Sequence, residues 1–129
     1  MSSPELGNIL CEHEKFVFSI LEENILLIFY KDKCIIEEDD VLIIEKAYND
    51  LPYAKPMKVI TQYGKFVSIS SEARIKAAER SPDLIAIAYV INSLSQRLLL
   101  KFYIKIVKRK KPTKVFQSIE EALEWLKPI

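Results

Sequence analysis

Glycine is almost absent from this chain, and its scarcity excludes the commonest nucleotide-binding loops. The 129 residues include two glycines, Gly7 and Gly64. Phosphate-cradling loops of the P-loop or dinucleotide-binding type need several glycines at fixed spacing, because the backbone must approach the phosphates closely. We therefore expect no nucleotide-dependent catalysis and no cofactor.

Histidine and cysteine are also scarce, which leaves little material for catalysis or metal binding. The single histidine, His13, has no serine or cysteine motif with which to form a catalytic triad. Cys11, His13 and Cys34 could meet as three metal ligands, but a C-x-H pair with one distant cysteine matches no common zinc spacing. We expect reduced thiols, no metal site and no enzymatic activity.

Long apolar runs and a leader-like start are missing as well. The longest unbroken apolar run, residues 84–91, is too short to cross a bilayer. The opening "MSSPELGNIL" lacks the basic and apolar regions of a secretory signal. Length and an apolar content of 50% are typical of a single domain, 1–129. We expect a soluble, cytoplasmic protein in which residues 1–14 form a loosely ordered N-terminal tail.

The charges are unevenly distributed along the chain. Residues 1–50 carry 12 acids and 4 bases, whereas residues 51–129 carry 6 acids and 15 bases. An anionic partner would first meet the acid-free stretch 84–119. The basic cluster "KRKKP" lacks interleaved aromatic residues, and the pI of about 7.7 is low for a nucleic-acid binder. Lys101 and Lys105 oppose membrane insertion, so we expect neither nucleic acid nor an inserted membrane segment.

Apolar periodicity predicts an alternating order of strands and helices. We expect strands at 16–21, 25–30, 57–63, 83–90 and 113–116. Helices are expected after the acidic run 37–40, over 71–80, through the long stretch from 92, and over 117–127. The acidic run suits a helix start, since it lacks the alternating ligands and central glycine of a calcium loop. The order predicts an α/β fold with a mixed, mainly parallel sheet, opened by an antiparallel hairpin and covered by about four helices.

The predicted helix after residue 92 carries a wide apolar arc. Leu98, Leu99, Phe102, Tyr103 and Ile106 lie opposite a stripe of cations and should pack on the sheet. Leu100, Ile104 and Val107 widen the arc beyond what one sheet contact needs, so they meet another helix, a ligand or a second subunit. The candidate interface or ligand surface is Arg97, Leu100, Lys101, Ile104, Val107 and Lys108.

The same patterns predict the core of the domain. Residues on apolar strands or on the apolar faces of helices should be buried, namely Phe18, Ile28, Val59, Ile85, Ile87, Leu98, Phe102 and Leu123. Trp125 should dock the last helix onto the domain, because the short strand 113–116 returns the chain to the sheet.

Two stretches carry a resemblance to a known family. "IAYVINSLSQRLLLKFYIK" (87–105) and "PTKVFQSIEEALEWL" (112–126), supported by the opening hairpin, resemble the STAS-like domains. These include anti-sigma factor antagonists, sulfate transporter tails and small stand-alone proteins of unassigned function. The chain is most similar to the stand-alone branch, which is sometimes described as similar to lipid-binding CRAL-TRIO domains. The resemblance implies a STAS-like fold and a class of interaction modules.

The resemblance also implies a candidate phosphorylation site. Signalling members carry a phosphorylatable serine at a helix start, typically within Asp-Ser-Ser-Gly. Here the corresponding stretch reads "ISSEAR", so Ser70 or Ser71 is the candidate switch position. Ile69 and Glu72 replace the flanking Asp and Gly, and both serines also fit a plain helix cap.

Three classes of function remain at this point. The first is a non-catalytic cytosolic interaction or regulatory module that contacts a partner protein or a second copy of itself as a homodimer. The alternative is a protein that binds a small apolar ligand or lipid between the sheet and the helices of 71–107. An enzyme using His13 or a cysteine ranks last.

Overall fold

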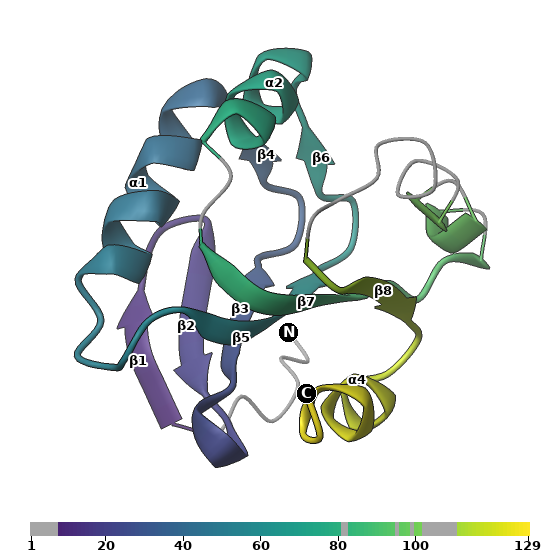
Figure 1. Ribbon diagram of the computed structural model, residues 1–129. Coiled ribbons are helices and arrows are strands. Elements are labelled where there is room, and N and C mark those ends of the chain that lie inside the picture. The colour runs from purple at the N-terminus through teal and green to yellow at the C-terminus, as the bar shows by residue number, and fades with distance from the viewer. Residues whose placement is uncertain (1–7, 81–82, 95, 99, 102–110) are drawn as a thin grey trace.

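The computed structural model describes residues 8–80, 83–94, 96–98, 100–101 and 111–129, and it contains a six-stranded sheet with helices on both sides (Figure 1). The strands of this sheet are β1 (Asn8–Glu12), β2 (Phe16–Ile20), β3 (Leu26–Tyr30), β5 (Met57–Tyr63), β7 (Leu84–Val90) and β8 (Thr113–Phe116). Two further strands, β4 (Ile35–Ile36) and β6 (Ser68–Ile69), form a separate small sheet. The helical elements include η1 (Glu22–Asn24), α1 (Glu38–Asn49), α2 (Ser71–Glu79) and α4 (Ile119–Leu126). Residues 94, 96–98, 100 and 101 are also helical.

The sheet combines an antiparallel and a parallel part. Its spatial order is β1-β2-β3-β5-β7-β8. The first three strands pair antiparallel, and the short turn η1 joins β2 to β3. β3, β5, β7 and β8 then pair parallel, so that their carboxyl ends lie at one edge of the sheet. The predicted mixed α/β sheet opened by an antiparallel hairpin is confirmed.

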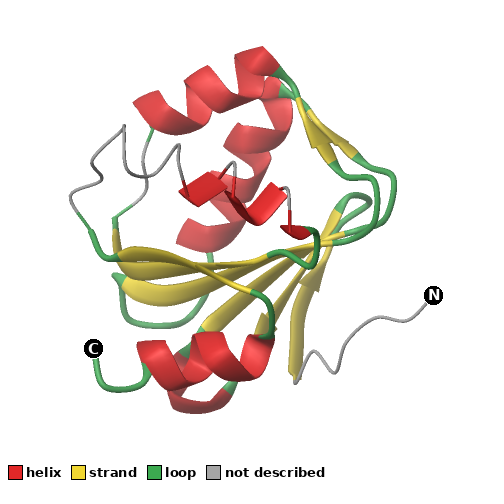
Figure 2. Cartoon of the chain, turned by 90° about the vertical axis from the view of Figure 1, so that its right-hand side faces the viewer, coloured by secondary structure: helices red, strands yellow, loops and turns green. Residues whose placement is uncertain are grey.

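Side chains that alternate along the strands pack into two cores, one on each side of the sheet. Leu26 and Ile28 of β3 join the core under α1, whereas Leu27 joins the core under α4. Figure 2 shows the helices as separate layers above and below the strands. None of the helices formed by the described residues has both the length and the apolar character needed to span a bilayer.

The predicted loose tail is wrong for residues 8–12, which form the edge strand β1. This strand pairs antiparallel with β2, and its Leu10 and Cys11 pack against the core under α1. The register shifts between Ile9 and Cys11, so the strand contains an irregularity of the bulge type. A bulge interrupts the simple alternation of apolar and polar residues, which is why the pattern gave no strand here. Residues 1–7 lie outside the described residues.

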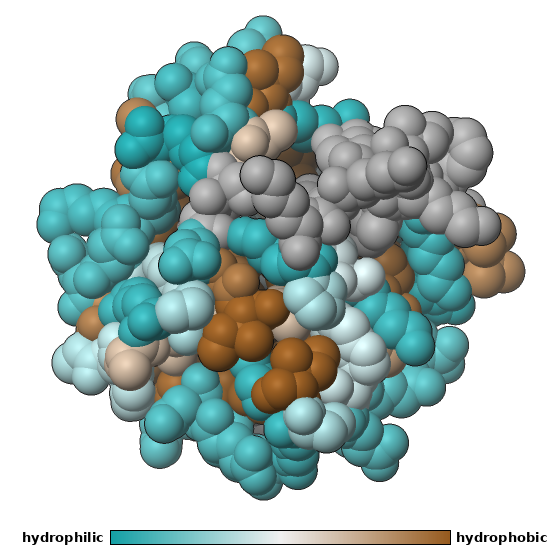
Figure 3. Space-filling view, in the orientation of Figure 1, coloured by the Kyte–Doolittle hydropathy of each residue, from teal (hydrophilic) through white to brown (hydrophobic). Residues whose placement is uncertain are grey.

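Most of the predicted core that falls on strands is confirmed. Phe18, Ile28, Val59 and Ile87 are buried, and Leu123 is half-buried against the core under α4. Ile85 is wrong, because its side chain is 39% exposed. It lies near the start of β7, before the pairing with β8 begins at Ile87, at the margin of the sheet. Figure 3 shows apolar surface between β7 and α4 on this face.

The predicted orientation of the helix after residue 92 is also wrong where it can be checked. Leu98, expected in the core, is 57% exposed. Its neighbour Arg97 is the half-buried residue instead, and its guanidinium donates to the carbonyl oxygens of Ile91 at 3.0 Å and Asn92 at 2.9 Å. Since adjacent helical residues point about 100° apart, turning Arg97 toward the end of β7 turns Leu98 outward. Phe102 lies outside the described residues.

The predicted docking of the last helix through Trp125 is confirmed. The Trp125 ring lies 5.6 Å from the Phe116 ring of β8, centroid to centroid, and both pack against the core under α4. At the helix start, Ser118 is the N-cap, and its Oγ accepts a hydrogen bond from Glu121 N at 3.2 Å.

Candidate functional site

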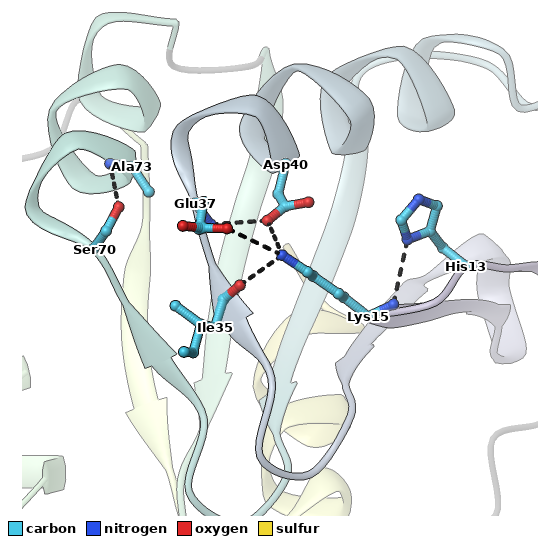
Figure 4. A network of polar contacts seen from close by, with 7 residues as sticks. All are labelled: His13, Lys15, Ile35, Glu37, Asp40, Ser70 and Ala73. Carbon is cyan, nitrogen blue, oxygen red and sulfur yellow. Dashed lines mark hydrogen bonds and ion pairs between the residues drawn. The ribbon is translucent and has the colours of Figure 1, made fainter.

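The small sheet of β4 and β6 brings the starts of two helices together. Its strands pair parallel, with Ile35 opposite Ser68 and Ile36 opposite Ile69. We call these two strands the ribbon; it stands apart from the main sheet at the upper right of Figure 2. β4 leads directly into α1 and β6 into α2, so the N-termini of both helices lie beside the ribbon (Figure 4). Sequence reasoning missed the ribbon, because strands of two residues have no readable periodicity.

A charged network fixes one edge of the ribbon. Lys15, which precedes β2, donates from Nζ to Asp40 Oδ2 at 2.7 Å and to the carbonyl oxygen of Ile35 at 2.8 Å (Figure 4). Asp40 Oδ2 also accepts from Glu37 N at 2.8 Å, at the first turn of α1. Glu37 itself lies 3.8 Å from Lys15 Nζ, and its side chain is 68% exposed. The network therefore holds the ribbon, the start of β2 and the start of α1 in one arrangement.

The network shifts the pKa values of its two main partners toward their charged forms. The hydrogen bond to Asp40 raises the pKa of Lys15. Burial alone would raise the pKa of Asp40, but the hydrogen bonds from Lys15 and from Glu37 N outweigh it and hold that pKa below its ordinary value. Both groups are charged at neutral pH.

The two candidate serines have different environments. Ser70 is the N-cap of α2, and its Oγ accepts a hydrogen bond from Ala73 N at 3.0 Å. The cap interpretation is thus confirmed for Ser70. Ser71 is the first residue of the helix and is exposed beside the likewise exposed Glu72. Phosphorylation of either serine stays a prediction.

The loop between β5 and β6 displays an aromatic side chain that the sequence did not single out. Phe66 is 81% exposed and has a φ of 59°, in the left-handed region that bulky residues rarely adopt. A phenylalanine in this conformation costs about 1–3 kcal/mol. Whether such a residue is buried depends on the backbone conformation of one loop, and no sequence pattern reports that conformation.

The surrounding hydrogen bonds hold this loop in place. Lys33 N donates to the carbonyl oxygen of Lys65 at 2.7 Å, and Lys65 N donates to Asp32 Oδ1 at 2.8 Å. Gly64 N donates to the carbonyl oxygen of Tyr30 at 2.7 Å. A Cβ on Gly64 would lie 2.4 Å from Asp32 Oδ1 and 2.8 Å from that carbonyl oxygen, so a side chain does not fit. The strained Phe66 is therefore presented from a fixed frame.

We define the ribbon surface as the exposed residues of the ribbon and of the two loops that lead into β4 and β6, namely Lys33, Ile35, Lys65, Phe66 and Ser68. Ile35 is 55% exposed, whereas the next residue along β4, Ile36, is buried beneath the ribbon. Lys33 and Lys65 form no ion pair with any described residue. Exposed apolar side chains with two neighbouring cations beside them are thus available for contact.

The surface predicted on the helix after residue 92 is described only in part. Arg97 is bound to carbonyl oxygens at the end of β7, Leu100 is half-buried, and Lys101 is exposed. Ile104, Val107 and Lys108 lie outside the described residues. The role of this surface stays a prediction.

The sparse metal-ligating and nucleophilic residues do not come together. His13 stacks on Phe16, with ring centroids 4.7 Å apart, and its Nδ1 accepts from Lys15 N at 3.3 Å. Burial raises the pKa of Cys34, which favours the neutral thiol. Across the described part of the chain, no three or more His, Cys, Asp or Glu side chains are arranged to hold a metal ion.

A row of tyrosines lies at the carboxyl ends of the parallel strands. Tyr30, Tyr63 and Tyr89, on β3, β5 and β7, are half-buried. The rings of Tyr30 and Tyr63, which face each other across the strands, stack with centroids 5.2 Å apart. Burial raises the pKa of Tyr30, so its phenol stays protonated. The row combines aromatic rings with hydroxyl groups.

Comparison with known proteins supports the fold and gives no activity. A family model described as "Domain of unknown function (DUF7793)" matches residues 19–129. No curated protein matches the chain in sequence. A crystal structure of an uncharacterized protein of the DUF3478 family from Shewanella loihica PV-4, with a SpoIIAA-like fold, matches 98% of this chain and 99% of its own, with a TM-score of 0.60 and 12% identity. The predicted STAS-like fold is confirmed.

Proposed function

The chain belongs to the DUF7793 family and has a SpoIIAA-like fold, and from this premise we propose that it is a non-catalytic cytosolic module that acts by protein–protein contact through its ribbon surface. The observation that carries the proposal is Phe66. Backbone strain persists only where surrounding structure fixes it and is concentrated at functional sites. Aromatic side chains, phenylalanine among them, are enriched in protein interfaces relative to the rest of the surface.

The composition of the ribbon surface supports the same function. Phe66 and Ile35 supply apolar area, and Lys33 and Lys65 supply charge beside it. Interfaces bury aromatic residues at their centre and keep charged residues at the rim, where those charges guide association. Ser71 lies exposed at the start of α2, next to the ribbon. A phosphate on Ser71 would change the charge of this region, which would regulate docking.

Site-specific photo-cross-linking tests the proposal. A photoreactive phenylalanine analogue is placed at Phe66 in the full chain and, as a control, at Ile75, which is 61% exposed on α2. From position 66 we expect a cross-link between the chain and a partner polypeptide of a single mass. From position 75 we expect no cross-linked product. Equal yields at both positions, or no product from position 66, would overturn the proposed function.

We propose binding of a small apolar ligand or lipid as a second candidate function, because the half-buried row of Tyr30, Tyr63 and Tyr89 favours it. Such side chains combine apolar area with hydroxyl groups that orient a ligand. Native mass spectrometry of freshly purified protein would then detect a bound small molecule that is reduced in Tyr63→Ala. A protein that carries no added mass in either form would remove this candidate.

A further inference from the structure

We propose that the partner of the ribbon surface is a second copy of this chain, bound about a two-fold axis through the ribbon surface and the exposed acids Glu37 and Asp39 that follow β4. This inference rests on the proposed function and names the partner. It starts from the order of exposed side chains along one segment. Lys33, Ile35 and Glu37 occupy alternate positions and are all exposed. An exposed cation in the turn before β4, an exposed apolar side chain in β4 and an exposed acid at the start of α1 therefore follow each other along the chain.

This order of charges is self-complementary. In a two-fold contact the two identical surfaces run in opposite directions. If one residue of the first copy contacts another residue of the second copy, the reverse contact forms as well. The Lys33 end of one copy then faces the Glu37 end of the other, and Ile35 lies near the axis in both. A different protein whose surface carries charge of one sign would complement only one end of the segment. A second copy matches both ends.

Neighbouring residues strengthen each end. Lys65 lies beside Lys33, because its carbonyl oxygen accepts from Lys33 N at 2.7 Å, and it adds a second cation. Asp39 follows Glu37 at the exposed start of α1 and forms no ion pair with a described residue. Phe66 follows Lys65 in the chain and is 81% exposed. Each copy thus contributes one aromatic anchor, and a two-fold axis brings both anchors into the contact.

The frame of the contact is already fixed in the single chain. Lys15 is held mainly by Asp40 and by the carbonyl oxygen of Ile35, and Glu37 lies farther away at 3.8 Å with most of its side chain exposed. The carboxylate of Glu37 pairs with Lys15 and takes part in the capping box of α1, but most of its side chain faces solvent, so a second copy can reach it. Because the ribbon needs no rearrangement, binding loses little conformational freedom.

Sedimentation of charge-reversed variants tests the inference. The acidic variant carries Lys33→Glu and Lys65→Glu, and the basic variant carries Glu37→Lys and Asp39→Lys. Wild-type protein should dimerise with rising concentration, whereas each variant alone should dimerise at least about tenfold more weakly, since like charges then face each other. An equimolar mixture should form a heterodimer, because an all-acidic surface meets an all-basic one. Glu120→Lys, at the exposed start of α4, is the matched control and should dimerise like wild type.

The outcomes separate this inference from the proposed function. A wild-type chain that stays monomeric at every concentration, or a mixture that forms no heterodimer, overturns the two-fold contact. If position 66 still cross-links to a different polypeptide, the proposed function stands without it. Circular dichroism checks that each variant is folded. Should Glu37→Lys unfold the chain, the acidic variant decides alone: its dimer should return at high salt, where repulsion is screened, and a dimer insensitive to salt and to both lysines overturns the inference.

Discussion

At the scale of single residues, Phe66 and Asp40 each raise the free energy of the folded chain, and their neighbours must offset this. Phe66 occupies a left-handed backbone conformation while most of its ring faces solvent. Asp40 is buried at the start of α1 and is stabilised by Lys15. The exposed ring of Phe66 does not stabilise the fold in any evident way, whereas Asp40 holds the ribbon against the domain.

The conformation of Phe66 predicts that stability and docking respond in opposite directions. Phe66→Gly removes the penalty of a side chain at positive φ, although glycine loses more freedom on folding. We expect the free energy of unfolding in urea to stay the same or to rise by up to about 1 kcal/mol, while docking is lost. A loss of more than about 1 kcal/mol would mean that the ring stabilises the fold.

The Lys15–Asp40 pair predicts a marked cost when the lysine is removed. Lys15→Met leaves a buried carboxylate with fewer partners and should lower the free energy of unfolding by about 1–3 kcal/mol at pH 7. Lys46→Met, which breaks the exposed pair with Asp50, is the control and should cost less than about 1 kcal/mol. Equal effects of the two changes would show that the network adds nothing.

The same pair has a defined dependence on pH. The pKa of Asp40 is lower in the folded than in the unfolded chain, so its contribution is complete above the unfolded value and disappears as the pH falls through the folded value. The pKa of Lys15 is raised, so its contribution is lost only as the pH rises through that higher value. Urea unfolding should therefore show the difference between wild type and Lys15→Met shrinking in acid. A difference that is constant down to about pH 2 would contradict this.

At the scale of elements, α2 is joined to the domain by few apolar contacts. Ala73 is its buried residue, and ion pairs link it to α1, with Lys76 3.7 Å from Glu38 and Arg80 Nε 3.0 Å from both carboxylate oxygens of Glu45. The cap at Ser70 then matters for where the helix begins. Its position beside the ribbon makes α2 part of the site.

The difference between the two serines gives a matched test of this cap. Ser70→Ala removes the acceptor for Ala73 N and should lower the free energy of unfolding by about 1 kcal/mol. Ser71→Ala removes an exposed hydroxyl and should change it by less than about 0.5 kcal/mol. Thermal or urea unfolding distinguishes them, and the reverse order would mean that Ser71 is the capping residue.

The accuracy of sequence-based prediction also differs among elements. The strands 57–63 and 113–116 were predicted with their observed ends, because Pro56 and Gly64 bound the first, and Pro112 and the helix cap at Ser118 bound the second. β1 was missed, since its bulge breaks the alternation, and the ribbon was missed because each strand is two residues long. Leu98 was placed on the wrong side, because a helical wheel gives the angles between residues but not the rotation of the helix on the sheet.

At the scale of the whole molecule, the fold determines which charges of the two parts of the chain lie on the same surface. The sequence places most of the acids in residues 1–50 and most of the bases in residues 51–129. The pairing of β4 with β6 brings Lys65, from the second half, beside the Lys33–Glu37 segment of the first. The result is a surface with both signs of charge around an apolar centre. Which residues share this surface could not be predicted, because that depends on the parallel pairing of segments far apart in the chain.

An NMR dilution series on the isotope-labelled full chain tests the central claim most directly. Amide shifts are followed from high to low protein concentration, without any substitution. The ribbon-surface contact predicts that concentration-dependent shifts are concentrated in residues 33–37 and 65–68, with smaller changes at the starts of α1 and α2. Shifts confined to another region, such as residues 94–101 with the exposed Leu94 and Leu98, or no shifts at all, would contradict it.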